Sequence, residues 1–202
     1  MNAYEAILNR RSIRSFGNKP VGIKNLRRMV NAARLAPSAG NMQILEFIIV
    51  TSASLREKIF KHLQWAGYLS PRLNPGQKDK PKAYIIILVN LSKLALPGAK
   101  NLAPDLRDIG AAAENIMLTA QADNIASCWL GAIDKEKLRR LFKLPGGINL
   151  DSVIALGQAN MPSKPVRFNG CVKYFLDNNN VLNVPKRSLN SITHLNGFKA
   201  KT

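Results

Sequence analysis

The segment Tyr84–Asn90, with the sequence YIIILVN, constrains the fold more than any other part of the chain. Five aliphatic side chains follow one another in it, so an extended backbone would present apolar groups on both faces. A strand of this kind is stable only where both faces are covered by other elements. The segment therefore predicts a strand in the middle of a sheet with helices packed on its two sides.

The other apolar patterns alternate between helical and extended spacing. They do so without the regular repeat of βαβ units, which favours an α+β fold with a mixed or antiparallel sheet flanked by helices. We expect helices at 2–10, from Ile23 to a stop at Pro37, at 56–63 after a cap at Ser52 or Ser54, at 105–123 and at 134–143, and strands at 47–51, 84–90, 127–133, 152–158 and 172–176.

The helix expected at 105–123 has a wide apolar stripe that is rich in small side chains. Small residues allow close approach of backbones, so the stripe is suited to the core, to a dimer interface, or to both. The members of the stripe are Ile109, Ala112, Ala113, Ile116, Met117 and Ala120.

The composition is that of a globular protein. The chain has 202 residues, of which 46% are hydrophobic and 21% charged, and this length predicts one domain over residues 1–202. Two cysteines, Cys128 and Cys171, are too few for a disulfide framework. With no secretory pattern at the N-terminus, they indicate reduced thiols and a cytoplasmic protein. The apolar runs are about half a membrane span, so we expect no membrane passage.

The charge is strongly positive, with 30 Lys and Arg against 12 Asp and Glu and a formal net charge of +18. Residues 1–40 and 164–202 together carry +13 of it. Such a charge is compatible with nucleic-acid binding, with an anionic membrane surface or with sites for phosphorylated small molecules. It is also compatible with a basic surface that has no partner. Nucleic acid is disfavoured, because aromatic residues make up only 6% and are not interleaved with the cations.

Common catalytic patterns are absent from the sequence, including the P-loop, G-x-G-x-x-G, G-x-S-x-G and H-E-x-x-H. The two histidines, His62 and His194, lie far apart without neighbouring cysteine or carboxylate clusters, so we expect surface residues and no metal site. A chain of this kind either binds a partner or takes its chemistry from a cofactor.

One candidate binding motif follows the first expected helix. It is the run Arg10-Arg11-Ser12-Ile13-Arg14-Ser15-Phe16. Guanidinium groups and a hydroxyl this close together suit a phosphate or a polar ribityl chain, although such a run also occurs on solvated surfaces.

A second candidate is the loop Ala36-Pro37-Ser38-Ala39-Gly40-Asn41-Met42-Gln43. Its small residues and two amides would let it press on a flat ring and hydrogen-bond the ring edge. The alternative is an ordinary turn between a helix and a strand.

Taken together and in this order, these segments resemble the nitroreductase family of flavin enzymes. The further parts of the resemblance are the helix sequence DIGAAAENIML at 108–118, SCWLG at 127–131, VIALG at 153–157 and VPKRSL at 184–189. The resemblance spans almost the whole chain. It implies an FMN-binding homodimer with two active sites at the dimer interface.

The resemblance also implies which residues hold FMN. Arg10, Arg11 and Ser12 look like the residues at the phosphate and ribityl chain, and Arg14 like the cation near the N1/O2 edge of the ring. By the same resemblance, Lys186 and Arg187 would contact the phosphate, Pro37, Ser38, Asn41 and Gln43 would reach the flavin from the other subunit, and the backbone of Leu130 and Gly131 would face the ring near N5.

The activity implied is hydride transfer from NADH or NADPH through FMN to small planar acceptors such as nitroaromatics and quinones, in a ping-pong cycle. No protein acid or base is assigned, because the flavin carries the chemistry. A basic polyanion-binding module and a flavin fold without turnover remain alternatives.

The irregular segment 65–82 is expected to be a substrate-side loop. Trp65 and Tyr68 are expected to anchor it on core aromatics rather than to stack on substrate. Trp129 is expected to pack in the core, with contact to the flavin ring left open.

Overall fold

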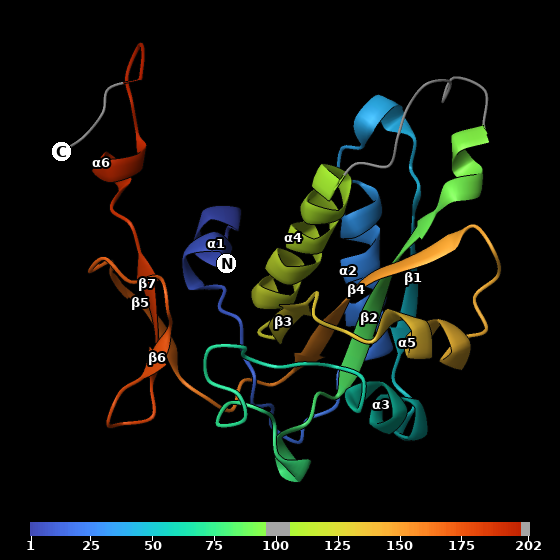
Figure 1. Cartoon of the computed structure of the whole chain (residues 1–202), viewed down its shortest axis with the longest axis horizontal. Helices are drawn as coiled ribbons and strands as arrows, with labels where there is room; N and C mark the ends of the chain where they lie inside the picture. The colour runs from blue at the N-terminus through green and yellow to red at the C-terminus, as the bar shows by residue number, and fades with distance from the viewer. Residues whose placement is uncertain (96–105, 199–202) are drawn as a thin grey trace. The chain divides into compact units, whose positions relative to one another are not determined.

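A computed structural model describes residues 1–95 and 106–198 (Figure 1). The chain falls into two compact units, Met1–Asn160 and Met161–Thr202. A single domain over 1–202 stays a prediction, and each unit is described by itself.

The larger unit is built on a four-stranded antiparallel sheet in the order β1-β2-β4-β3. Its strands are β1 (Leu45–Val50), β2 (Ala83–Asn90), β4 (Ile148–Gly157) and β3 (Ala126–Leu130). Every residue of β2 is buried, and β2 lies between β1 and β4. The predicted central strand and the α+β class are therefore confirmed, with an antiparallel rather than a mixed central sheet.

One face of this sheet is covered by α2 (Ile23–Arg34) and α4 (Leu106–Ala122). The apolar stripe of α4 packs against alternate residues of the sheet, such as Ile85 and Ile154. Its small residues are fully buried in this core, so they belong to the interior of the chain rather than to a contact with a second copy. The expected first residue of this helix, 105, lies outside the described residues.

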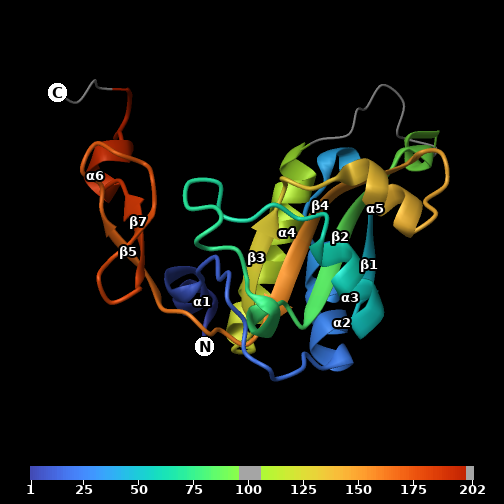
Figure 2. The same ribbon diagram turned by 60° about the horizontal axis from the view of Figure 1, so that its bottom comes forward.

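The opposite face of the sheet is covered by α3 (Ala53–Phe60) and α5 (Lys135–Leu141) (Figure 2). Tyr84 alternates with Ile85 on β2 and therefore points to this side, where it is fully buried. Burial raises the pKa of its hydroxyl far above the usual value. Helix α3 begins after Ser52, whose hydroxyl accepts the N–H of Leu55, so the first of the two predicted caps is confirmed.

The N-terminal helix α1 (Ala3–Asn9) is followed by an extended segment that runs along the free edge of β3. The Ile13 N–H donates to the Ser127 carbonyl at 2.9 Å, and Phe16 then pairs with Ala159. The Phe16 side chain is fully buried. The sheet is thus extended on the β3 side by a segment from the start of the chain.

Residues 65–82 are irregular apart from the short 3-10 helix η2 (Gln77–Asp79), as the sequence predicts. Trp65 is 4% exposed and packs on the rings of Phe16 and Phe60, so this end of the segment is anchored on core aromatics. At the other end, the buried Lys80 ammonium lies 2.6 Å from a Glu57 carboxylate oxygen and 4.6 Å from the centre of the Phe60 ring. The expected role of Tyr68 is not confirmed, since its side chain is 55% exposed.

The smaller unit holds a three-stranded sheet in the order β5-β7-β6, followed by α6 (Leu189–Ile192). Its strands are β5 (Ser163–Arg167), β7 (Leu182–Lys186) and β6 (Phe175–Leu176). The strand predicted at 172–176 is present only over its last two residues. Strands β5 and β7 were not predicted, because Pro165, Pro185 and several polar residues interrupt their apolar alternation.

None of the helices in the described parts of the chain is long and apolar enough to cross a membrane.

We predict that Gly157→Ala destabilises the larger unit by about 1–3 kcal/mol, because overpacking forces side chains or backbone to move. A Cβ at Gly157 would lie 2.9 Å from Cδ1 of Phe16 and 3.1 Å from its Cβ, and Phe16 has no free space to withdraw. Urea unfolding measures the change.

The matched control is Gly110→Ala in α4, where a Cβ would meet nothing within 4 Å. In a helix interior this exchange stabilises by about 0.5–1 kcal/mol. Equal effects of the two substitutions would contradict the close approach of Phe16 to β4.

Candidate functional site

The predicted arginine motif lies directly beside β3. Helix α1 ends at Asn9, and Arg10 turns the chain into an extended conformation with φ −61° and ψ 126°. Arg10, Arg11, Ser12 and Arg14 are all partly buried, and the hydrogen bond from Ile13 to Ser127 fixes their backbone to the strand. The motif is therefore an ordered part of the sheet edge rather than a solvated run.

The arginines form a positive cluster with like charges close together. Burial lowers the pKa of Arg11, and the neighbouring charge of Arg10 lowers it further. The Arg11 guanidinium donates through Nη1 to the Arg10 carbonyl at 2.7 Å, and Arg10 Nε lies 3.4 Å from a carboxylate oxygen of Glu114 on α4. Burial and the charge of Arg10 both disfavour the charged form of Arg11. An anion bound beside Arg11 would counteract both effects and stabilise the charged guanidinium.

The effect of the cluster extends to β3. Burial raises the pKa of the Cys128 thiol, while the charges of Arg14 and Arg10 act in the opposite direction. The arginines therefore lie near enough to this strand to influence its side chains. Cys128 itself is a fully buried thiol and is not available as a nucleophile.

The C-terminal end of β3 leaves open space beside the backbone. Leu130 is 6% exposed, whereas Gly131 is exposed and a Cβ built on it would meet nothing within 4 Å. Trp129 is 41% exposed, with its indole N–H donating to the Ser152 hydroxyl at 2.7 Å. The expectation that Trp129 packs in the core is therefore wrong, because the residue lies on β3 at the edge of the sheet and its side chain remains exposed.

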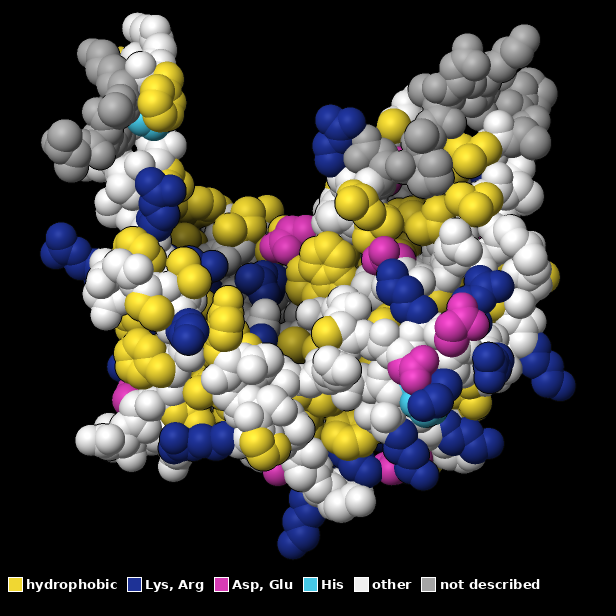
Figure 3. Space-filling view, viewed as in Figure 1, with side chains coloured by type: hydrophobic (Ala, Val, Ile, Leu, Met, Phe, Trp, Pro, Cys, Tyr) yellow, Lys and Arg dark blue, Asp and Glu magenta, His cyan; other side chains and the backbone are white. Residues whose placement is uncertain are grey.

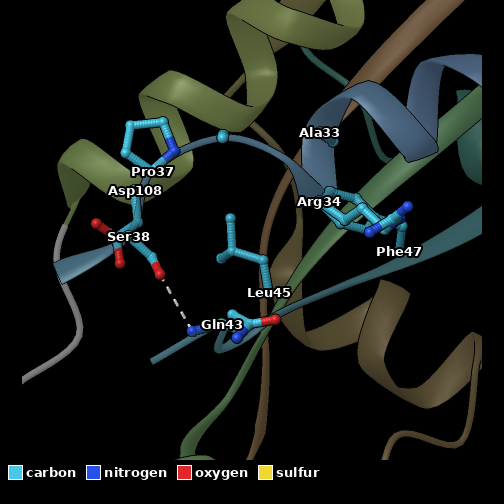
Figure 4. A pocket seen from close by; sticks show the side chains of 9 residues that line it. Ala33, Arg34, Pro37, Ser38, Gln43, Leu45, Phe47 and Asp108 are labelled. Atoms are coloured by element: carbon cyan, nitrogen blue, oxygen red, sulfur yellow. Dashed lines mark hydrogen bonds between the residues drawn. The ribbon is translucent and has the colours of Figure 1, made fainter. Parts of the chain in front are cut away.

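The loop Pro37–Gln43 contains the 3-10 helix η1 (Ala39–Asn41) and an unusual backbone. Gly40, Asn41 and Gln43 all have φ between 51° and 54°, in the left-handed region. Figure 4 shows the Ser38 hydroxyl accepting the Gln43 N–H at 3.2 Å, which closes the loop on itself. Pro37, Asn41 and Gln43 are exposed, so their side chains can meet a ligand or a second chain.

A buried carboxylate supports this loop. Asp108, near the start of α4, is 5% exposed and accepts the Ala39 N–H at 3.0 Å. It also lines a cavity of about 120 Å³ beside the loop, together with Arg34, Ser38 and Phe47 (Figure 4). Sequence reasoning used Asp108 only as a landmark. The available signal was an acidic residue at a helix start that directly precedes the apolar stripe beginning at Ile109.

The structure brings some predicted site residues together and keeps others apart. Arg10, Arg11, Ser12 and Arg14 lie along β3, which ends at Leu130 and is followed by Gly131. The loop 37–43 is bound to α4 at Asp108, whereas the arginines are bound to α4 at Glu114. These helix positions differ by about 9 Å along the axis and about 120° around it, so the two groups attach to different faces of α4.

Lys186 and Arg187 belong to the smaller unit. Lys186 ends β7, and the Arg187 guanidinium donates to the Ser191 carbonyl at 2.9 Å. Both side chains are exposed. Their predicted role at the phosphate stays a prediction.

Across residues 1–95 and 106–198, no three His, Cys, Asp or Glu side chains are grouped closely enough to hold a metal ion.

The antiparallel sheet is covered on both faces and has a cluster of partly buried arginines along its edge strand, which defines an α+β protein. Comparison with known proteins identifies the family. The sequence profile of the Nitroreductase family matches residues 7–158, and the chain belongs to this family. The predicted enzyme class and its FMN cofactor are confirmed at the level of the family.

Individual relatives agree with this assignment. The chain is 32% identical over 157 residues to a protein of Archaeoglobus fulgidus named putative NADH dehydrogenase/NAD(P)H nitroreductase, covering 75% of this chain and 82% of that one. A solved structure from Parabacteroides distasonis, also described as a putative NADH dehydrogenase/NAD(P)H nitroreductase, superposes with a TM-score of 0.68 at 23% identity, over 98% of this chain and 100% of the other.

A putative nitroreductase from Desulfovibrio desulfuricans, solved in complex with FMN, shares the fold with a TM-score of 0.62. It is 22% identical, and the match covers 80% of this chain and 88% of that one.

We predict that Asp108→Ala destabilises the larger unit by about 1–3 kcal/mol, because it leaves the Ala39 amide without its acceptor. Asp108→Asn keeps an oxygen at this position and is expected to recover most of the loss. Urea unfolding gives the stability of both variants, and amide hydrogen exchange at Ala39 reports the loop directly. Unchanged exchange in Asp108→Ala would contradict a supporting role for this carboxylate.

Proposed function

We propose that this protein is an FMN-dependent oxidoreductase that passes a hydride from NADH or NADPH to small planar acceptors such as nitroaromatics and quinones. The family assignment supports the cofactor and the reductant, and the name of the A. fulgidus relative includes NAD(P)H nitroreductase activity. The observation that carries the proposal is the partly buried arginine cluster beside a strand end with open space at Gly131.

The phosphate of FMN would be held by Arg10, Arg11 and Ser12. The fit is supported by the lowered pKa of Arg11, since a dianionic phosphate compensates both its burial and the adjacent charge of Arg10. Lys186 and Arg187 would add two cations from the smaller unit.

The isoalloxazine ring would lie along the end of β3. The open space at Gly131 lets a flat ring approach the backbone of Leu130 and Gly131 without meeting a side chain. Arg14 would then place a positive charge at the N1/O2 edge of the ring, where it favours the reduced, anionic flavin. The flavin supplies the hydride chemistry, and the residues of the chain bind it, orient it and set its electrostatics.

The second half of the site would come from another copy of the chain. Within one chain the loop 37–43 and the arginines attach to different faces of α4, so a loop that reaches a flavin bound beside β3 would belong to a partner. Helix α1 supports a homodimer as well, because Tyr4, Ile7 and Leu8 are 69%, 50% and 52% exposed. In this arrangement Pro37, Ser38, Asn41 and Gln43 would contact the flavin of the other subunit.

The reaction would run as a ping-pong cycle, with the reductant leaving before the acceptor binds to the same face of the flavin. No side chain is assigned as acid or base. The segment 65–82, anchored by Trp65 and Lys80, would contact the acceptor. A cytoplasmic location is proposed from the reduced thiols Cys128 and Cys171.

Two measurements test this function. The protein purified from a flavin-containing host, or titrated with FMN, is expected to show flavin absorbance. With FMN bound, it is expected to oxidise NADH or NADPH in the presence of a quinone, with parallel double-reciprocal lines as a ping-pong cycle requires. No FMN uptake would exclude the function, and FMN binding without NAD(P)H oxidation would indicate a flavin fold without turnover.

The phosphate assignment predicts that Arg10→Ala combined with Lys186→Ala weakens FMN affinity at least tenfold. Each substitution removes a charge-assisted hydrogen bond worth about 1.5–3 kcal/mol. Quenching of FMN fluorescence gives the dissociation constant. The control is Lys24→Ala with Lys173→Ala, which removes one exposed cation from each unit away from the motif. Equal affinities of the two double variants would show that the phosphate lies elsewhere.

A further inference from the structure

A positively charged depression lies between α3 and α5, and it has no part in the proposed function. Its volume is about 430 Å³. Figure 3 shows Lys and Arg side chains gathered around a histidine over these two helices. The lining residues are Lys58, Lys61, His62, Lys137, Arg140 and Leu141.

The depression is formed by one basic face of each helix. Lys58 and Lys61 are three residues apart at the end of α3, and Lys137 and Arg140 are three apart on α5, so each pair lies on one side of its helix. Main-chain hydrogen bonds hold the two faces together. The Asp134 N–H donates to the His62 carbonyl and the Gln64 N–H to the Ala132 carbonyl, both at 2.9 Å.

Most of this charge is not neutralised by the protein. Lys137 is paired with Asp134, with 3.1 Å between the ammonium nitrogen and a carboxylate oxygen. Within the described parts of the chain, Lys58, Lys61 and Arg140 make no ion pair with a carboxylate. The depression therefore combines four cations, of which one, Lys137, is ion-paired within the described residues. Glu57 on α3 and Glu136 on α5 also lie on these two helices.

We propose that this depression binds a ligand that carries two or more phosphate groups, such as inorganic pyrophosphate or a nucleoside diphosphate. A ligand with two phosphate groups can present one group to the cations of each helix. Arg140 can donate a bidentate pair to one phosphate, while the lysines act as flexible point charges on the other.

The proposed site is distinct from the flavin site and does not depend on the proposed function. Helices α3 and α5 lie on the face of the sheet toward which Tyr84 points, whereas Arg10 contacts α4 on the opposite face. No residue of the depression is among those expected to hold FMN.

The test compares two double charge reversals that change the net charge equally. Lys61→Glu with Arg140→Glu removes one cation from each side of the depression. Lys24→Glu with Arg27→Glu reverses an exposed pair of cations on α2, where neither side chain is ion-paired within the described residues. All four side chains are exposed, so both variants are expected to fold, and thermal unfolding confirms this.

Isothermal titration with inorganic pyrophosphate is carried out at constant ionic strength on the protein saturated with FMN, with flavin fluorescence recorded to detect displacement. We expect the wild type and the α2 variant to bind within twofold of each other. The Lys61→Glu, Arg140→Glu variant is expected to bind at least tenfold more weakly. Sulfate is expected to bind the wild type at least tenfold more weakly than pyrophosphate.

Equal losses in the two double variants would overturn the proposal, because they would reflect net charge alone. An unchanged affinity in the Lys61→Glu, Arg140→Glu variant, or displacement of flavin by pyrophosphate, would overturn it as well. A short DNA or RNA duplex that bound through Lys61 and Arg140 more tightly than pyrophosphate, with a steep salt dependence, would assign the depression to nucleic acid instead.

Discussion

The attachment of the segment after α1 to the edge of β3 is the interaction on which the candidate site depends. One backbone hydrogen bond, from Ile13 to Ser127, sets the register of this segment, and the buried Phe16 ring fixes its end against Gly157. The arginines between α1 and Phe16 gain their positions from these two contacts. Without them, Arg10, Arg11 and Arg14 would be three mobile cations, and their mutual repulsion would drive them apart. The side chain of Phe16 therefore influences the electrostatics of a site that it does not touch.

The parts of the fold that could be predicted from sequence are those that depend on local pattern. The apolar run of β2 can be buried only between other strands, and the periodic stripe of α4 fits only a covered sheet face. The strands of the smaller unit could largely not be predicted. Strands β5 and β7 are short and parallel to each other, and Pro165 and Pro185 interrupt their apolar pattern. Their stability comes from pairing with each other rather than from the apolar pattern of their own residues.

The candidate site shows the same division. The arginine motif was found because its residues are adjacent in sequence. The support of Ala39 by Asp108 was missed, because it joins residues 69 positions apart and has no local signature. The exposure of Trp129 could not be predicted for a similar reason, since it depends on β3 being the edge strand of the sheet, which the local sequence does not show. The proposed sharing of the site between two chains is supported by the family resemblance and by the two different faces of α4 that the loop and the arginines contact.

The positive charge of the chain divides into groups with different environments. The N-terminal arginines are partly buried against β3, the cations of α3 and α5 surround an open depression, and others are spread over the surface among Asp and Glu side chains (Figure 3). The net charge of +18 therefore comes from cations in different surroundings. Backbone hydrogen bonds fix the main chain that carries the N-terminal arginines and the main chain that joins α3 to α5. These two groups differ in this way from cations on a general basic surface.

The anchoring of the irregular segment at Trp65 and Lys80 has a consequence for how this protein can diverge. Each end is held by contacts to Phe60 or Phe16, while most residues between them are exposed. Insertions and substitutions in this interval can therefore be accommodated without altering the sheet beneath it. In the proposed function, where the interval contacts the acceptor, such changes would alter the choice of acceptor while the two anchors keep the fold.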